Sequence, residues 1–218
     1  MASTAFVFLT HTQLVNIFRK GYCYSLDDKT KFEQGIDSYI LPSVIKDMQF
    51  RVRGMGVKKQ GAKALSDIKK DFSGYLKKEF WNYFHSNQSF ASFHDKACND
   101  MVEIFSQRYN NVTYGKGQKA VNMTFKYFYC FENSDSSKNE SNFSDCHMPL
   151  DSKILEWYRN EIDSSQKTAW SYLKKDEYDT IQDNISKHIR QKYNNNYTVL
   201  QAEFVIWNNA INNKAGTP

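Results

Sequence analysis

The chain is organised around YGKGQKAVN, residues 114–122, and around MPLD, residues 148–151. Two glycines, one residue apart in the first stretch, are expected to end one helix and to begin the next. Lys119 lies in the first turn of that next helix, and Asp151 follows a proline at the start of a later amphipathic segment. We expect these two side chains to form one site.

Apolar residues recur at helical spacing along most of the chain, and no segment has a strong strand pattern. The three prolines and nine glycines are few, which favours long helices over a turn-rich sandwich. The sequence therefore predicts an all-α fold. Helices are expected over residues 10–20, 32–40, 62–84, 90–109, 118–131, 152–162, 166–173, 178–193 and 198–212, with Pro42 ending the second or beginning the next turn.

The length of 218 residues and the 40% hydrophobic content are sufficient for a single domain with its own core. The net charge of +5 is compatible with a polyanionic partner but does not by itself indicate one. The stretch from residue 51 to residue 70 is rich in lysine and glycine, and Lys58 and Lys59 are its candidates for contacts with a DNA backbone. A solvated loop followed by a polar helix face is the alternative interpretation of this stretch.

The four cysteines form no C-x-x-C pair and no iron–sulfur spacing, and His147 beside Cys146 has no companion at ligand spacing. We therefore expect no metal, no cofactor and reduced thiols. The first fourteen residues lack a basic segment, and no stretch is long enough to cross a membrane. These features predict a cytoplasmic protein without a membrane partner, which we expect to be a monomer, close to the nucleoid when it acts.

The helix expected over residues 118–131 has a narrow polar stripe among its aromatic residues. Lys119, Asn122 and Lys126 are spaced three and then four residues apart and therefore share one face. A mostly apolar helix with one such stripe is expected to be buried, with the stripe facing a cleft or a partner.

A Gly-x-Gly turn before a helix is suited to anion binding. The first backbone N–H groups of a helix have no partner within it, and the helix dipole attracts negative charge to that end. Gly115, Lys116, Gly117 and Gln118 are therefore the candidate contacts to a DNA phosphate. A neighbouring lysine with a lowered pKa is a usable amine nucleophile.

The pattern Gly115-x-Gly117-x-Lys119 followed by Pro149-x-Asp151 resembles the helix–hairpin–helix DNA glycosylases, which include endonuclease III and the 8-oxoguanine glycosylases. The archaeal 8-oxoguanine glycosylase branch is the most similar in its spacing. The sequence departs from the family at residues 113–114, where Leu-Pro is usual. It also has a long polar spacer over residues 132–145 and lacks the cysteine cluster of endonuclease III.

The resemblance implies a helical bundle in two lobes with a central cleft. One lobe would hold residues 1–50 with 160–218, and the other residues 51–159. It also implies that Lys119 attacks the sugar of an extruded nucleotide, that Asp151 assists proton transfer, and that Pro149 shapes the base pocket. The partner would be duplex DNA with a modified base, and the reaction base excision, with or without lyase activity.

A different class of function fits the same residues. The chain is alternatively a non-enzymatic helical module that binds nucleic acid or protein, of a regulatory or phage-defence type. In that case Lys119 is an ordinary lysine beside a structural turn, and Asp151 only caps its helix. The distance between the two side chains, and whether they line a cleft, distinguishes the two hypotheses.

Overall fold

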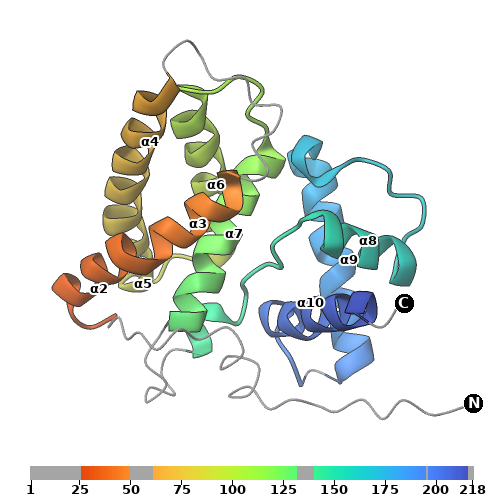
Figure 1. Ribbon diagram of the computed structural model, residues 1–218. Helices are drawn as coiled ribbons and strands as arrows, with labels where there is room; N and C mark the ends of the chain where they lie inside the picture. The colour runs from red at the N-terminus through yellow and green to blue at the C-terminus, as the bar shows by residue number, and fades with distance from the viewer. Residues whose placement is uncertain (1–25, 50–60, 132–139, 195, 216–218) are drawn as a thin grey trace, which may run out of the picture.

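The computed structural model describes residues 26–49, 61–131, 140–194 and 196–215. In these ranges the chain is mostly helical and contains no strand, so the all-α prediction is confirmed (Figure 1). The helix expected over residues 10–20 lies outside the described residues, as do Lys58, Lys59 and most of the polar spacer.

The described elements follow one another through the sequence as three groups. The first group is α2 (Lys29–Gly35), the π-helix η1 (Ile36–Ile40), α3 (Leu41–Gln49), α4 (Gly61–Tyr75), the π-helix η2 (Leu76–Phe80), α5 (Trp81–Phe84) and α6 (Phe90–Ser106). The second is α7 (Tyr114–Phe131) alone. The third is the 3₁₀ turn η3 (Glu140–Phe143), α8 (Ser152–Glu161), the 3₁₀ turn η4 (Trp170–Tyr172), α9 (Lys175–Tyr193) and α10 (Val199–Ala215).

Pro42 does not end a helix, which was one of the two roles expected for it, and it lies in the first turn of α3. It lies inside the continuous helical run from α2 to α3, directly after the π-helix η1. The backbone N–H of Leu41 bonds to the carbonyl of Ile36, five residues back, so the bonding pattern has already shifted where the proline lacks its donor. The run expected over residues 62–84 is likewise continuous from α4 to α5, with one π turn at η2.

Two hydrophobic cores lie on either side of α7 (Figure 1). The first core joins α2 to α7 and is rich in phenylalanine, with Phe80 5.0 Å from Phe93 and 5.1 Å from Phe125 between ring centroids. The second core joins α8, α9 and α10 mainly through isoleucine, leucine and tyrosine. The described part of residues 1–50 packs in the first core with residues 61–146 and with Leu200 and Phe204 of α10.

The glycines at the start of α7 lie within the helix and not in a turn before it. The helix begins at Tyr114, four residues earlier than predicted, after a connection in which Asn111 adopts a left-handed φ of 57°. Early helix positions tolerate glycine where close packing requires it, which is the situation here. The helix expected over residues 166–173 reduces to the single turn η4, because this segment folds inward to place Trp170 in the second core.

In the part of the chain that the structure describes, none of the helices has the length and apolar character needed to cross a membrane.

Candidate functional site

The polar stripe of α7 connects the helix to three C-terminal elements. Its three side chains are buried, and each reaches a different partner segment. The contacts are Lys119 Nζ to Asp151 Oδ2 at 3.3 Å, Asn122 Nδ2 to Tyr178 Oη at 2.9 Å, and Lys126 Nζ to Glu203 Oε1 at 2.8 Å. The stripe therefore faces the start of α8, the body of α9 and the body of α10.

Lys119 and Asp151 are brought together as expected, although they are 32 residues apart in sequence. The two oxygens of Asp151 have separate roles. Oδ1 accepts the backbone N–H groups of Lys153 at 2.9 Å and Ile154 at 3.0 Å and so caps α8, while Oδ2 faces the lysine. The side chains are only 5% and 6% exposed, so the pair lies in the interior and not along an open cleft.

Gly115 and Gly117 serve close packing in this structure. A Cβ at Gly115 would lie 2.0 Å from the carbonyl oxygen of Trp170, and one at Gly117 would lie 2.4 Å from that of Cys98. Their N–H groups are also bonded within the protein, to the carbonyls of Leu173 at 3.0 Å and Thr113 at 3.1 Å. These donors are therefore occupied and do not face an incoming phosphate.

The other described residues that were expected to contact DNA are buried as well. Lys116 is 3% exposed, and its Nζ donates to the carbonyl oxygen of Asn111 at 2.6 Å. Burial lowers the pKa of Lys116. Gln118 is fully buried, and Pro149 is buried in the segment that leads to Asp151.

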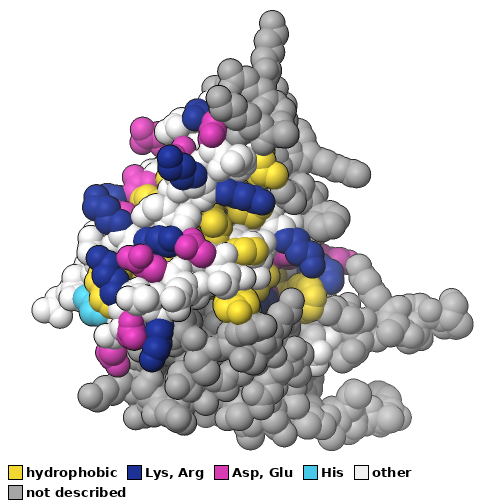
Figure 2. Space-filling view, turned by 60° about the vertical axis from the view of Figure 1, so that its left-hand side comes forward, with side chains coloured by type: hydrophobic (Ala, Val, Ile, Leu, Met, Phe, Trp, Pro, Cys, Tyr) yellow, Lys and Arg dark blue, Asp and Glu magenta, His cyan; other side chains and the backbone are white. Residues whose placement is uncertain are grey.

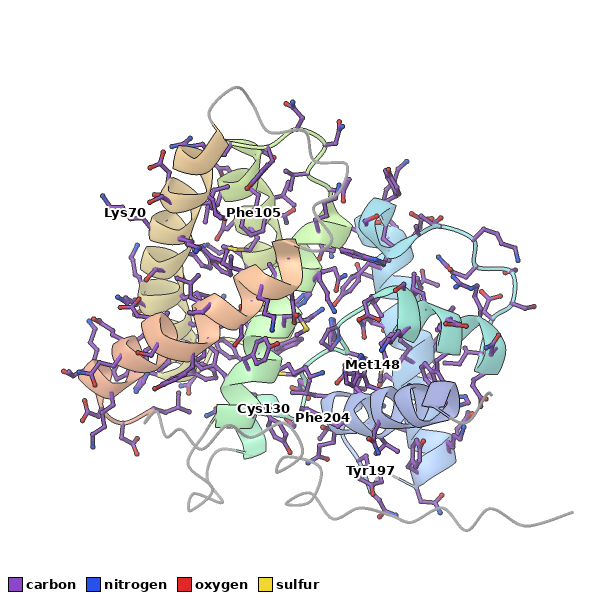
Figure 3. The ribbon with its side chains drawn as sticks, in the orientation of Figure 1. Lys70, Phe105, Cys130, Met148, Tyr197 and Phe204 are labelled. Carbon is purple, nitrogen blue, oxygen red and sulfur yellow. The ribbon has the colours of Figure 1, made fainter. Side chains whose placement is uncertain are left out.

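A second buried ion pair, Lys126 with Glu203, was not predicted from the sequence. Nζ lies 2.8 Å and 2.7 Å from the two carboxylate oxygens, and the rings of Phe204 and Trp207 cover it at 4.9 Å and 5.6 Å. Figure 3 shows Phe204 of α10 next to Cys130 at the end of α7. The sequence signal was an acidic residue among the apolar residues of the last helix, a position that requires a buried partner.

A hydrogen-bond chain continues from the stripe through the interior, and its direction follows from two backbone carbonyls. The Gln118 amide N–H groups donate to the carbonyls of Gly115 at 2.9 Å and Leu150 at 3.2 Å, so its Oε1 must face Asn122. The Asn122 amide then donates to both Gln118 and Tyr178, at 2.9 Å each.

The same logic fixes two histidine tautomers. His94 Nε2 lies 2.9 Å from Asn122 Oδ1, which only accepts, so His94 carries its proton on Nε2. The Tyr178 oxygen accepts from Asn122 at 2.9 Å and from His94 Nε2 at 3.3 Å, so its own proton is donated to His147 Nδ1 at 2.7 Å. His147 consequently carries its proton on Nε2.

Burial keeps both imidazoles neutral. It lowers the pKa of His147 to about 4, and it lowers the pKa of His94 well below the usual value. The two neutral rings complete a network in which every step from Gln118 to His147 has a defined donor and acceptor.

The described residues line a cavity of about 780 Å³ that is open to solvent on one side, at the C-terminal end of α7. Its lining comes from α7, η3 and the residues after it, α9, and the connection into α10, and it includes His147 but neither Lys119 nor Asp151. Tyr129 of the lining is ten residues beyond Lys119, which corresponds to about 15 Å along a helix. The cavity and the Lys119–Asp151 pair are therefore separate features of the same helix.

The surface in Figure 2 has Lys and Arg side chains interspersed with Asp and Glu side chains, without a field of one sign. Among the described residues, several such charges form ion pairs, for example Lys77 with Asp37 at 2.6 Å and Lys96 with Asp100 at 2.6 Å. The described side chains visible in Figure 2 form no basic stripe of the kind that follows a DNA backbone.

The described residues hold no group of three or more His, Cys, Asp or Glu side chains that could bind a metal ion, and Cys98, Cys130 and Cys146 are buried thiols. No family model, curated protein or solved structure matches the chain.

Proposed function

We propose that the chain is a DNA base-excision glycosylase in which Lys119 and Asp151 form the reactive pair. The observation that carries the proposal is the 3.3 Å contact between two side chains from distant segments, one of them held in place as a helix cap. A lysine amine beside a fixed carboxylate is the combination that nucleophilic displacement of a base requires.

In the proposed reaction, Lys119 is the nucleophile and Asp151 is the proton acceptor. Asp151 Oδ2 accepts a proton from the Lys119 ammonium, and the neutral amine attacks C1′ of an extruded nucleotide. The N–C1′ bond forms as the glycosidic bond breaks, and the base departs with its electron pair and takes up a proton. Opening of the C1′–O4′ bond then gives a protonated imine on Lys119.

Access to the amine is a requirement of this mechanism, because the Lys119 side chain is 5% exposed. The contacts across the seam include two ion pairs, the bonds to Tyr178, and the bonds of Gly115 and Gln118 to the carbonyls of Leu173 and Leu150. Movement of α8 to α10 away from α7 would open the pair, and it would also separate Leu200 and Phe204 of α10 from the first core. Lesion DNA would have to stabilise that open state.

Borohydride trapping tests the proposal. Borohydride reduces the imine to a stable amine, so a panel of duplexes with modified bases should yield a covalent protein–DNA adduct with one of them. Lys119→Gln should abolish the adduct. Lys126→Gln is a matched control, because it removes a second buried lysine from the same helix, two turns on, and should leave the adduct in place.

A second function is favoured by a specific observation. The glycine N–H groups are occupied and the pair is buried, as expected if both serve only to hold the helices together. The chain would then be a non-enzymatic helical binding module. Failure of every lesion in the panel to give either an adduct or an abasic site would support this alternative and contradict the glycosylase.

A further inference from the structure

The cavity at the C-terminal end of α7 has the composition of a small-molecule site. Its volume of about 780 Å³ is within the usual range for ligand pockets, about 300–1,000 Å³. Three aromatic side chains contribute to the lining, Tyr129, Phe143 and Tyr197, together with hydrogen-bonding groups of both kinds. A planar heterocycle with polar edges suits such a lining better than an apolar ligand does.

The cavity contains one donor whose orientation is already fixed. His147 lines the cavity, and its Nδ1 is bonded to Tyr178, so the proton on Nε2 is available to an acceptor. No described residue accepts a hydrogen bond from that Nε2. A donor held in place before binding adds specificity at little entropic cost.

The charges of the lining favour a neutral ligand that carries N–H donors. Asp145 and Asp183 are acceptors when ionised, Arg190 supplies one positive charge, and His147 is neutral, which leaves a net charge of −1. A phosphate would meet this excess of carboxylate charge unfavourably. An exocyclic amino group would instead find an acceptor.

We propose that this cavity binds a nucleoside whose base carries an exocyclic amino group, with His147 donating to the base and a carboxylate of the lining accepting from its amino group. The proposal is independent of the glycosylase chemistry, since the site lies about two to three helical turns from Lys119 along α7.

Calorimetric titration of the full chain with adenosine, cytidine, uridine and adenosine 5′-monophosphate tests this. Adenosine or cytidine should bind with a Kd below about 1 mM. Uridine, which lacks the amino group, and the monophosphate should each bind at least several-fold more weakly. Asp183→Asn, at an exposed lining position, should reduce the preference for the amino-bearing base.

A variant that fills the cavity tests whether the nucleoside binds there and not elsewhere on the surface. Ser186→Tyr places a bulky ring in the lining and should reduce affinity by at least tenfold, whereas Lys187→Tyr, at the next and exposed position outside the lining, should leave it unchanged. Thermal unfolding of both variants confirms that they fold. Absence of binding by both adenosine and cytidine, equal binding of uridine, or unchanged binding by Ser186→Tyr would overturn the proposal.

Discussion

Two buried lysine–carboxylate pairs lie on α7, seven residues apart, and they differ in how completely they are closed. Lys126 meets both oxygens of Glu203 at 2.7–2.8 Å beneath two aromatic rings. Lys119 meets one oxygen of Asp151 at 3.3 Å, while the other oxygen caps α8. The short double contact and the aromatic cover are typical of a structural pair. The contact of Lys119 with Asp151 is longer and involves one carboxylate oxygen.

The different contacts of Lys126 and Lys119 show that burial alone does not assign a role to a charged pair. Both pairs join α7 to the C-terminal helices, and only one belongs to a motif that suggests chemistry. Because they share a helix and a similar exposure, each is the natural control for the other.

The largest expected effect on stability comes from breaking the Lys126–Glu203 pair. Lys126→Met leaves the Glu203 carboxylate buried without its cation and should lower the free energy of unfolding by about 3–5 kcal/mol. Urea denaturation measures it. The double variant Lys126→Met with Glu203→Leu should recover most of the loss, because no charge then remains buried. A loss below about 1 kcal/mol for the single variant would show that the pair is not structural.

A smaller effect on stability is expected from breaking the Lys119–Asp151 pair. Lys119→Met should lower the free energy of unfolding by about 1–3 kcal/mol. Asp151 would lose its cation but keep its two backbone N–H donors. Glu203, in contrast, loses the cation that contacts both of its oxygens. The same denaturation series compares the two variants directly. Equal losses at Lys119 and Lys126 would remove the distinction drawn between the pairs.

The network beside the stripe predicts a dependence of stability on pH. Burial lowers the pKa of His147 from its usual value of about 6.5 to about 4, so the unfolded chain binds more protons between these pH values. Stability is therefore retained above pH 6.5 and is lost as the pH falls toward 4, by about 2 kcal/mol between pH 7 and pH 5 for this group. His94 acts in the same direction.

Denaturation at several pH values checks this dependence. His147→Asn should flatten the curve over pH 5–7. A curve that keeps its slope in His147→Asn would mean that other groups cause the dependence.

Much of the fold was predictable because its signals are local. Helical spacing located α6, α8, α9 and α10 to within a few residues, and the stripe of Lys119, Asn122 and Lys126 predicted one polar face on α7. The stripe's partners could not be predicted, since nothing local in α7 indicates which distant segment completes it.

The prediction that Gly115 and Gly117 form a turn before the helix was wrong for a physical reason. A glycine in a turn and a glycine in a crowded helix look alike in sequence, and only the carbonyls of Trp170 and Cys98 show that Gly115 and Gly117 are the second kind. The cavity could not be predicted from the sequence, because its lining comes from four separate segments, none of which carries a motif.

Peptide mapping of the borohydride-trapped adduct tests the central claim most directly. After proteolysis, mass spectrometry locates the reduced sugar remnant on one lysine. The Lys119–Asp151 mechanism predicts that the mass increase lies on Lys119 and that the peptide with Lys126 is unmodified. A remnant on Lys126 or on any other lysine, or no trapped adduct with any lesion, would contradict it.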